Sequence, residues 1–215
     1  MDVVCSGVVL LMILAIAPVA KAAKESAVNL LEAEALLKSG WWRGSTAATN
    51  ISAYCQWPGI ICNDAGSVTE ILLPGYGIQD DLTNFSFSSF PNLVRLDLSR
   101  NALDGAIPHQ IGALTKITYL NLSSNHLRGE LPSSLVNLTQ LAQLDVSWNS
   151  IDSLNPPGIG NLTNLVTLDL SYNSLFGPIP STLGQLSNLD SLDLSNNHFS
   201  ETIPSTLFNL TNLSQ

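Results

Sequence analysis

The sequence predicts a solenoid, in which short coils stack into a curved rod with a parallel β-sheet along the concave face. Three observations predict it. Five segments with one pattern follow each other between Leu93 and Pro204, their anchor leucines recur every 24 residues, and an asparagine follows each anchor at a fixed distance. A fixed period of this length is typical of stacked repeats, because one coil cannot bury its own apolar side and needs a neighbour.

Each copy contains one short strand. The copies begin LVRLDL at Leu93, ITYLNL at Ile117, LAQLDV at Leu141, LVTLDL at Leu165 and LDSLDL at Leu189. The alternation of apolar and polar residues places Leu96 and Leu98 inward and Asp97 toward solvent, with the same arrangement in the other copies. We therefore expect a row of parallel strands along one edge of the stack.

An asparagine stands where the chain leaves each strand, at Asn101, Asn125, Asn149, Asn173 and Asn197. An amide can both donate to and accept from the backbone groups of a buried turn, which predicts an asparagine ladder along the stack. A glycine and an apolar-Pro pair usually follow. Ser153 and Glu201 replace that glycine, and Asn155 precedes Pro156 in place of an apolar residue, so we expect these two coils to be irregular.

The combined pattern L-x-x-L-x-L-S-x-N-x-L-x-G-x-I-P resembles the plant-type leucine-rich repeat. That family builds the ectodomains of receptor-like kinases and receptor-like proteins, and the polygalacturonase-inhibiting proteins. The resemblance implies a right-handed leucine-rich-repeat solenoid. The alternative, in which the leucines mark amphipathic helices, fails because glycine and proline interrupt every candidate helix.

Residues 1–22 are typical of a secretory signal peptide. Val8 to Ala17 is apolar, Pro18 interrupts the run, and Ala20-Lys21-Ala22 offers a small-x-small cleavage site. Asp2 departs from the usual basic start. The apolar run is too short to span a bilayer comfortably, although an uncleaved anchor is the alternative.

Residues 23–67 are expected to form an N-terminal cap. Helical spacing over residues 29–42 predicts a helix that packs on the first coil through Leu30, Ala33, Leu37 and Trp41, and residues 43–52 are expected to form a surface loop. Cys55 and Cys62 are the only cysteines outside the signal peptide, which predicts a disulfide in a secreted protein. The block from Cys55 to Cys62 is similar to the cap of plant leucine-rich-repeat receptors.

The remaining boundaries follow from the repeats. Residues 68–92 form a degenerate first repeat, with inward Val68, Ile71, Leu73, Ile78 and Leu82, with Tyr76 at the asparagine position, and with Phe85, Phe87 and Phe90 on the convex side. Residues 93–212 hold the five repeats, and residues 213–215 start a sixth. No polar closing coil follows, so we expect a truncated product without a C-terminal cap, whose bare apolar end favours association or early melting.

Composition excludes several functions. The net charge of -9 leaves no basic patch for nucleic acid. Kinase motifs are absent, and His109, His126 and His198 are too dispersed to hold a metal, so we expect no enzyme activity, cofactor or metal. The row Asp97, Asp145, Asp169 and Asp193 repeats one consensus position on an open surface. We therefore interpret it as framework rather than as acid-base catalysts.

Binding is the remaining role. Solvent-facing residues of the concave sheet are free to vary, and aromatic residues and arginine commonly anchor interfaces. The ligand-contact candidates are Arg95, Arg100, Tyr119, Gln143, Trp148 and Tyr172. The alternative is that these are solvated framework positions and that ligand binds further along the stack. N-glycosylation sequons occur at Asn50, Asn84, Asn121, Asn137, Asn161 and Asn209, with a seventh at Asn212.

The sequence and the resemblance together predict an extracellular recognition module from the N-terminal ectodomain of a receptor-like kinase or receptor-like protein. It would bind a peptide or protein ligand and a co-receptor ectodomain, without nucleic acid, at the extracellular face of the plasma membrane. The alternative is a soluble inhibitor or co-receptor in the apoplast, of the polygalacturonase-inhibitor kind.

Overall fold

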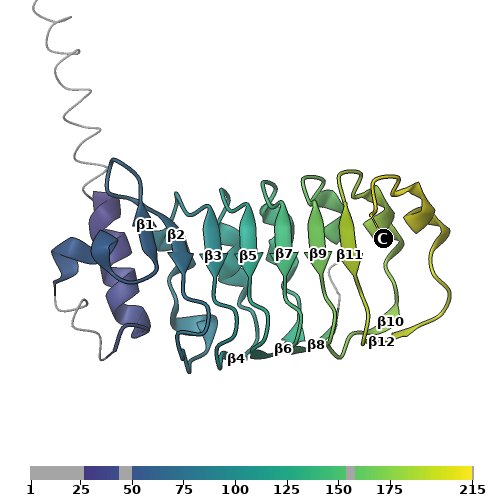
Figure 1. Ribbon diagram of the computed structural model, residues 1–215, viewed down its shortest axis with the longest axis horizontal. Helices are drawn as coiled ribbons and strands as arrows, with labels where there is room; N and C mark the ends of the chain where they lie inside the picture. The colour runs from purple at the N-terminus through teal and green to yellow at the C-terminus, as the bar shows by residue number, and fades with distance from the viewer. Residues whose placement is uncertain (1–26, 44–49, 154–157, 215) are drawn as a thin grey trace, which may run out of the picture.

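The computed structural model describes residues 27–43, 50–153 and 158–214, which form one elongated stack of coils (Figure 1). Along one face runs a sheet in the order β1-β2-β3-β5-β7-β9-β11. The strands are β1 (Ile60–Cys62), β2 (Val68–Leu72), β3 (Arg95–Asp97), β5 (Tyr119–Asn121), β7 (Gln143–Asp145), β9 (Thr167–Asp169) and β11 (Ser191–Asp193). Only the β1–β2 pair in this sheet is antiparallel.

The anchor leucines lie in register across this sheet. Leu96 pairs with Leu120, which pairs with Leu144, and the row continues through Leu168 to Leu192. All but Leu192 are almost completely buried. Residues 24 positions apart in the sequence are therefore paired on neighbouring strands, which confirms the predicted parallel solenoid.

Two further features of each coil were not predicted. A second edge of the stack carries short parallel strands: β4 (Asp104–Gly105), β6 (His126–Glu130) and β8 (Ser150–Ser153), then β10 (Phe176–Pro178) and β12 (His198–Ser200). Short 3-10 helices also occur along the stack: η3 (Leu82–Asn84), η4 (Phe87–Ser89), η5 (His109–Ala113), η6 (Ser133–Asn137), η7 (Ile159–Asn161), η8 (Ser181–Gln185) and η9 (Ser205–Asn209). Proline precedes η5, η6, η8 and η9 and fixes the backbone at each entry.

The asparagine ladder is confirmed, and Asn149 shows its geometry. Its amide nitrogen donates to the carbonyl of Val146 in the same coil and to that of Leu122 in the preceding coil, at 3.1 and 3.0 Å. Its oxygen accepts the N–H of Leu127, also in the preceding coil, at 2.9 Å. Asn101, Asn125, Asn173 and Asn197 make the equivalent bonds. Each asparagine thus joins two coils.

The residue before each ladder asparagine has a left-handed backbone. Positive φ angles of 52° to 56° occur at Arg100, Ser124, Trp148, Tyr172 and Asn196. This conformation is uncommon for residues other than glycine. Its recurrence in five successive coils shows that the tight turn after the strand requires it, whatever side chain is present.

The coil that has Ser153 in place of glycine is locally irregular, as expected, whereas the coil that has Glu201 keeps the positive φ of the glycine position and pairs β10 with β12 without a register shift. The pairing of β6 with β8 shifts register between Gly129 and Glu130, where Glu130 faces Ser153. Glu201 adopts a φ of 68°, close to that of Gly177 at the same position one coil earlier. Asn155 and Pro156 lie outside the described residues.

The cap helix spans residues 27–39, and its predicted buried face was partly wrong. Ala33 is buried as expected, but Leu30 and Leu37 are 60% and 51% exposed, while Glu32 and Leu36 are fully buried. Glu32 sets this orientation, because its carboxylate accepts hydrogen bonds from the first coil.

The rest of the cap agrees with expectation. Trp41 is buried and stacks on Phe85 with ring centroids 4.5 Å apart. Cys55, in η2 (Ile51–Gln56), forms the predicted disulfide with Cys62 in β1. The inward residues of the first repeat and its three phenylalanines are buried.

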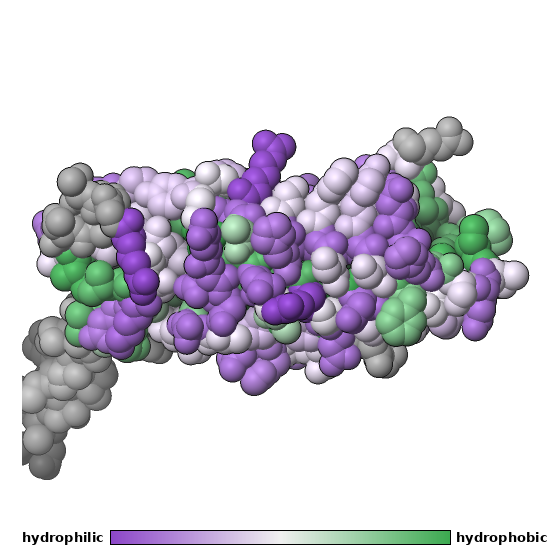
Figure 2. Space-filling view, turned by 90° about the horizontal axis from the view of Figure 1, so that it is seen from below, coloured by the Kyte–Doolittle hydropathy of each residue, from purple (hydrophilic) through white to green (hydrophobic). Residues whose placement is uncertain are grey.

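Several expectations concern the ends of the chain. The signal peptide predicted at 1–22 lies outside the described residues, as does most of the loop predicted at 43–52. Within the described part, no helix has the length and apolar character to cross a membrane. Figure 2 shows apolar side chains gathered at the C-terminal end, where Ile203 and Phe208 are 64% and 79% exposed.

Candidate peptide- and protein-binding surface

The main sheet presents one row of solvent-facing side chains, which we call the strand column. It consists of Glu70, Arg95, Tyr119, Gln143, Thr167 and Ser191, one from each parallel strand and each paired in register with the next. Strand neighbours are about 4.8 Å apart. A partner that lies along the stack therefore meets a new side chain at each strand.

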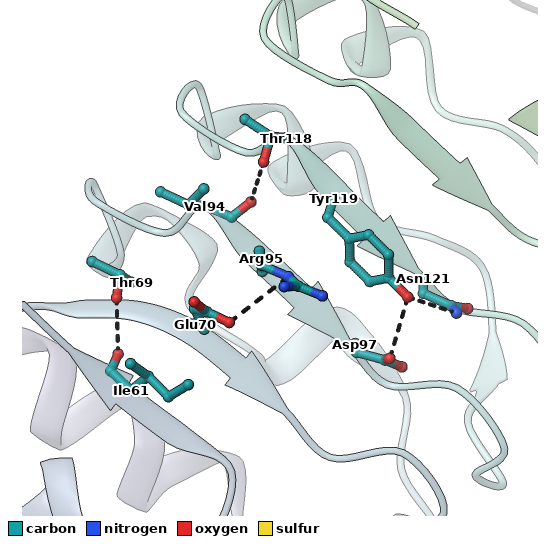
Figure 3. Close-up of polar contacts among 9 residues, drawn as sticks. All are labelled: Ile61, Thr69, Glu70, Val94, Arg95, Asp97, Thr118, Tyr119 and Asn121. Atoms are coloured by element: carbon teal, nitrogen blue, oxygen red, sulfur yellow. Dashed lines mark hydrogen bonds and ion pairs between the residues drawn. The ribbon is translucent and has the colours of Figure 1, made fainter. Parts of the chain in front are cut away.

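The first half of the strand column is already partnered within the protein (Figure 3). The Arg95 guanidinium lies 3.7 Å from the Glu70 carboxylate and 4.8 Å from the centre of the Tyr119 ring. The Tyr119 hydroxyl donates to Asp97 at 3.4 Å and accepts from the amide of Asn121 at 3.2 Å. This network holds Arg95 and Tyr119 in place and neutralises the guanidinium.

A second row, the turn column, comprises the left-handed residues Arg100, Ser124, Trp148, Tyr172 and Asn196. Trp148 and Tyr172 stack face to face, with ring centroids 3.9 Å apart and planes 12° apart. They remain 56% and 42% exposed. Stacked, exposed aromatic rings offer a rigid apolar contact at a low cost in conformational entropy.

Three of the six predicted contact residues, Arg95, Tyr119 and Gln143, lie in the strand column, and the other three, Arg100, Trp148 and Tyr172, lie in the turn column. The structure joins Arg95 to Tyr119 and joins Trp148 to Tyr172. Gln143 is exposed on β7, and Arg100 is exposed in the turn column, with no acidic partner among the described residues. Glu70 was not among the predicted contact residues, because it belongs to the irregular first repeat. The first repeat is one residue longer than the others, so Glu70 pairs with Arg95, 25 residues later, and an alignment that allowed for this extra residue would have identified Glu70.

The predicted aspartate row acts as part of the framework. One carboxylate oxygen of Asp145 accepts both the N–H and the hydroxyl of Ser147, at 2.9 and 2.7 Å. Asp97, Asp169 and Asp193 each accept the N–H of the serine two residues later. Asn121 makes the same bonds in the second repeat, at 2.9 and 2.7 Å. An amide therefore serves as well as a carboxylate, which explains the position without catalysis.

The sequons differ in accessibility. Asn50, Asn84, Asn137, Asn161 and Asn209 are exposed. The last three end η6, η7 and η9, so they occupy the same position in three coils, and Gln185 holds that position in η8. Asn121 is half-buried within the network around Tyr119.

Two ionisable groups with raised pKa values, Glu32 and Tyr54, lie in the cap. Burial raises the pKa of the Glu32 carboxyl, although hydrogen bonds from Ser67, Val68 and Tyr54 oppose the shift. Burial, reinforced by the nearby Glu32 charge, raises the pKa of Tyr54 to about 12. In the described part of the chain, no group of three or more His, Cys, Asp or Glu side chains could hold a metal ion.

Comparison with known proteins identifies the family to which this stack of coils belongs. A family model described as a leucine-rich repeat region matches residues 77–215, more than half of the chain. A probable leucine-rich repeat receptor-like protein kinase of Arabidopsis thaliana is 38% identical over 99 residues, which cover 40% of this chain and 9% of that protein. The chain thus spans a small part of this relative.

Two solved structures from Arabidopsis thaliana share the fold. The ectodomain of the receptor kinase GASSHO1/SCHENGEN3, in complex with CASPARIAN STRIP INTEGRITY FACTOR 2, has a TM-score of 0.78 at 35% identity and covers 86% of this chain and 23% of its own. The receptor kinase HAESA, in complex with the peptide hormone IDA and the co-receptor SERK1, has a TM-score of 0.69 at 27% identity and covers 84% of this chain and 36% of its own.

Proposed function

The chain belongs to the leucine-rich-repeat family, and from this we propose that it is an extracellular recognition module that holds a peptide or protein on its concave sheet. We place it in the N-terminal ectodomain of a plant receptor-like kinase or receptor-like protein. The observation that carries the proposal is the strand column, in which six parallel strands each present a solvent-facing side chain in register.

The fold separates framework from recognition. Anchor leucines and ladder asparagines point into the stack and fix its geometry, while strand-column residues point outward from the core. A stable interface buries about 800 Å² on each partner. One coil offers far less than this, so a ligand has to extend over several coils.

The relatives support this class of ligand. The GASSHO1/SCHENGEN3 ectodomain is in complex with CASPARIAN STRIP INTEGRITY FACTOR 2, and HAESA is in complex with the peptide hormone IDA and the co-receptor SERK1. For this chain we propose a peptide or protein ligand and a co-receptor ectodomain. No observation favours the soluble inhibitor alternative, and the kinase activity in the relatives' names is not attributed to these coils.

The proposed organisation is a signal peptide at 1–22, a cap at 23–67, a first repeat at 68–92, five repeats at 93–212 and the start of a sixth at 213–215. We propose N-glycans at Asn50, Asn84, Asn137, Asn161 and Asn209, whose side chains are exposed. Asn121 is the least favourable sequon, because its amide already donates to the Tyr119 hydroxyl. The disulfide and the exposed sequons support a location at the extracellular face of the plasma membrane or in the apoplast.

Site-specific photo-crosslinking tests the proposal. A photoreactive amino acid replaces Gln143, which is exposed on the concave β7, and in a matched protein it replaces Ser133, which is exposed in η6 of the preceding coil. Both proteins are incubated with plant extracellular fluid and illuminated, and the captured species are identified by mass spectrometry. We expect a defined peptide or protein from position 143 and not from position 133. Equal capture at both positions, or none at position 143, would contradict recognition on the concave face.

A further inference from the structure

The two halves of the concave face differ in how their charges are balanced. In the first half, Glu70 neutralises Arg95, and the pair lies beside Tyr119. In the second half, Asp145, Asp169 and Asp193 lie on β7, β9 and β11, and among the described residues no lysine or arginine pairs with any of them. The second half therefore carries negative charge that the protein itself leaves unbalanced.

Two of these aspartates are in the same coils as the exposed aromatic rings of Trp148 and Tyr172. The Asp145 carboxylate accepts hydrogen bonds from the backbone N–H and the hydroxyl of Ser147, the residue before Trp148. Asp169 is bonded in the same way to Ser171, the residue before Tyr172. Only one oxygen of each carboxylate is used in these bonds, so the other is free to accept from a partner. The two aspartates with an unused oxygen thus stand three residues before Trp148 and Tyr172, whose exposed rings stack on each other.

Building on the proposed function, we infer that the surface formed by Asp145, Asp169, Asp193, Trp148 and Tyr172 binds a basic, extended peptide segment. Lysine or arginine head groups pair with the free aspartate oxygens, and a guanidinium or the stem of a basic side chain lies on the exposed aromatic rings. The net charge of -9 favours approach of a cationic partner. An acidic segment would meet repulsion at the same place.

The spacing of the strands selects one peptide geometry. Asp145 and Asp193 are two strand steps apart, which is about 9.6 Å at about 4.8 Å per step. A polyproline II segment rises about 3.1 Å per residue and has three residues per turn, so positions i and i+3 lie on one face about 9.3 Å apart. Basic residues at every third position of such a segment match the aspartates that flank Asp169.

Three peptides of equal length and spacing test the preference for basic charge. They are (Pro-Pro-Arg)4, (Pro-Pro-Gln)4 and (Pro-Pro-Glu)4, each carrying the same fluorescent label and titrated with the full chain by fluorescence anisotropy. We expect the arginine peptide to bind about tenfold more tightly than the glutamine peptide, and more weakly as salt is added. The glutamate peptide should bind more weakly than both.

The chain itself supplies conservative variants. Asp145→Asn with Asp169→Asn keeps the turns, since Asn121 makes the same bonds in the second repeat. Trp148→Ser keeps the left-handed backbone, since Ser124 has a φ of 55° at the equivalent position. Asp104→Asn with Asp152→Asn is the control, because it removes two carboxylates from the second edge of the stack and changes the net charge equally.

The expected result is that the double variant at 145 and 169 loses about tenfold in affinity for the arginine peptide and that Trp148→Ser loses about threefold or more. The control should bind as the parent does. Equal affinity for the arginine and glutamine peptides, or an equal loss in the control, overturns the inference.

Other outcomes separate this inference from the proposed function. If the glutamine or glutamate peptide binds best and Trp148→Ser weakens it, the concave face recognises peptides but not basic ones. If none of the three peptides binds while crosslinking from position 143 captures a ligand, the proposed function stands and the basic-peptide inference is wrong. If crosslinking from position 143 also captures nothing, the proposed function itself fails.

Discussion

The Glu32 carboxylate accepts the backbone N–H of Val68 at 2.9 Å and thereby joins the cap helix to the first parallel strand. The same carboxylate accepts the Ser67 hydroxyl at 2.6 Å. Glu32 is fully buried, so it satisfies backbone and side-chain groups of the first coil in a place that water does not reach.

This arrangement predicts that stability falls as pH rises above about 4.5. The pKa of Glu32 in the folded protein is raised from its ordinary value of 4.5, so the fold favours the protonated form. The resulting stability is fully present below the unfolded pKa and is lost as pH rises through the folded pKa. Urea unfolding between pH 4.5 and 7 should show this decline in the parent.

The Glu32→Gln variant should flatten that pH dependence, because the glutamine oxygen can accept from Val68 and its amide can donate to Ser67. Glu34→Gln is the control, since Glu34 pairs only with the exposed Lys38. The pKa of Asp81 is lowered, so the stability that Asp81 contributes is lost only as pH falls below about 3.8. Asp81 therefore does not affect the change in stability between pH 4.5 and 7. An unchanged slope in Glu32→Gln would show that another group is responsible.

Asn149→Leu should lower the free energy of unfolding by about 3 kcal/mol or more, because carbonyls of two coils and the N–H of Leu127 lose their partner while remaining buried. Asn164→Leu removes one exposed bond, to the carbonyl of Thr139, and should cost about 1 kcal/mol or less. Chemical denaturation of both variants measures the difference. Similar losses would argue against a special role for the ladder.

Leu144→Asp should loosen several coils together. Leu144 is completely buried and lies in register between Leu120 and Leu168, so an aspartate there places an unpaired charge in the shared core. Hydrogen exchange should rise in β5 and β9 as well as in β7. Gln143→Asp, at the exposed neighbouring position, should leave exchange nearly unchanged. Increased exchange confined to β7 would contradict cooperative stacking.

Glu201→Gly should stabilise the fifth repeat by about 0.5 to 1 kcal/mol. Glu201 has a φ of 68°, where a left-handed backbone costs a residue with a Cβ about 1 to 2 kcal/mol. Glycine avoids that cost but loses about 0.5 to 1 kcal/mol of chain entropy on folding. Thermal unfolding measures the balance, and Ser200→Gly in β12 should instead destabilise. A lower melting temperature for Glu201→Gly would disprove the strain argument.

Much of this fold can be predicted from the sequence because the same short sequence pattern recurs in successive coils. A leucine pattern of period two decides which side of each strand is buried, and a repeat of 24 residues places Leu96, Leu120 and Leu144 side by side. The asparagine position is equally local, because each ladder asparagine caps carbonyls two and three residues before it.

Contacts between residues distant in sequence decided the rest. The cap helix has apolar residues on all sides, so its pattern could not show that Leu30 faces out and Leu36 faces in. The N–H of Val68, 36 residues beyond Glu32, decided that orientation. In the same way, the strand spacing brought Glu70 against Arg95 and Trp148 against Tyr172. Periodicity determines which side chains reach the surface, but packing between coils determines which of them satisfy one another and which remain free to bind.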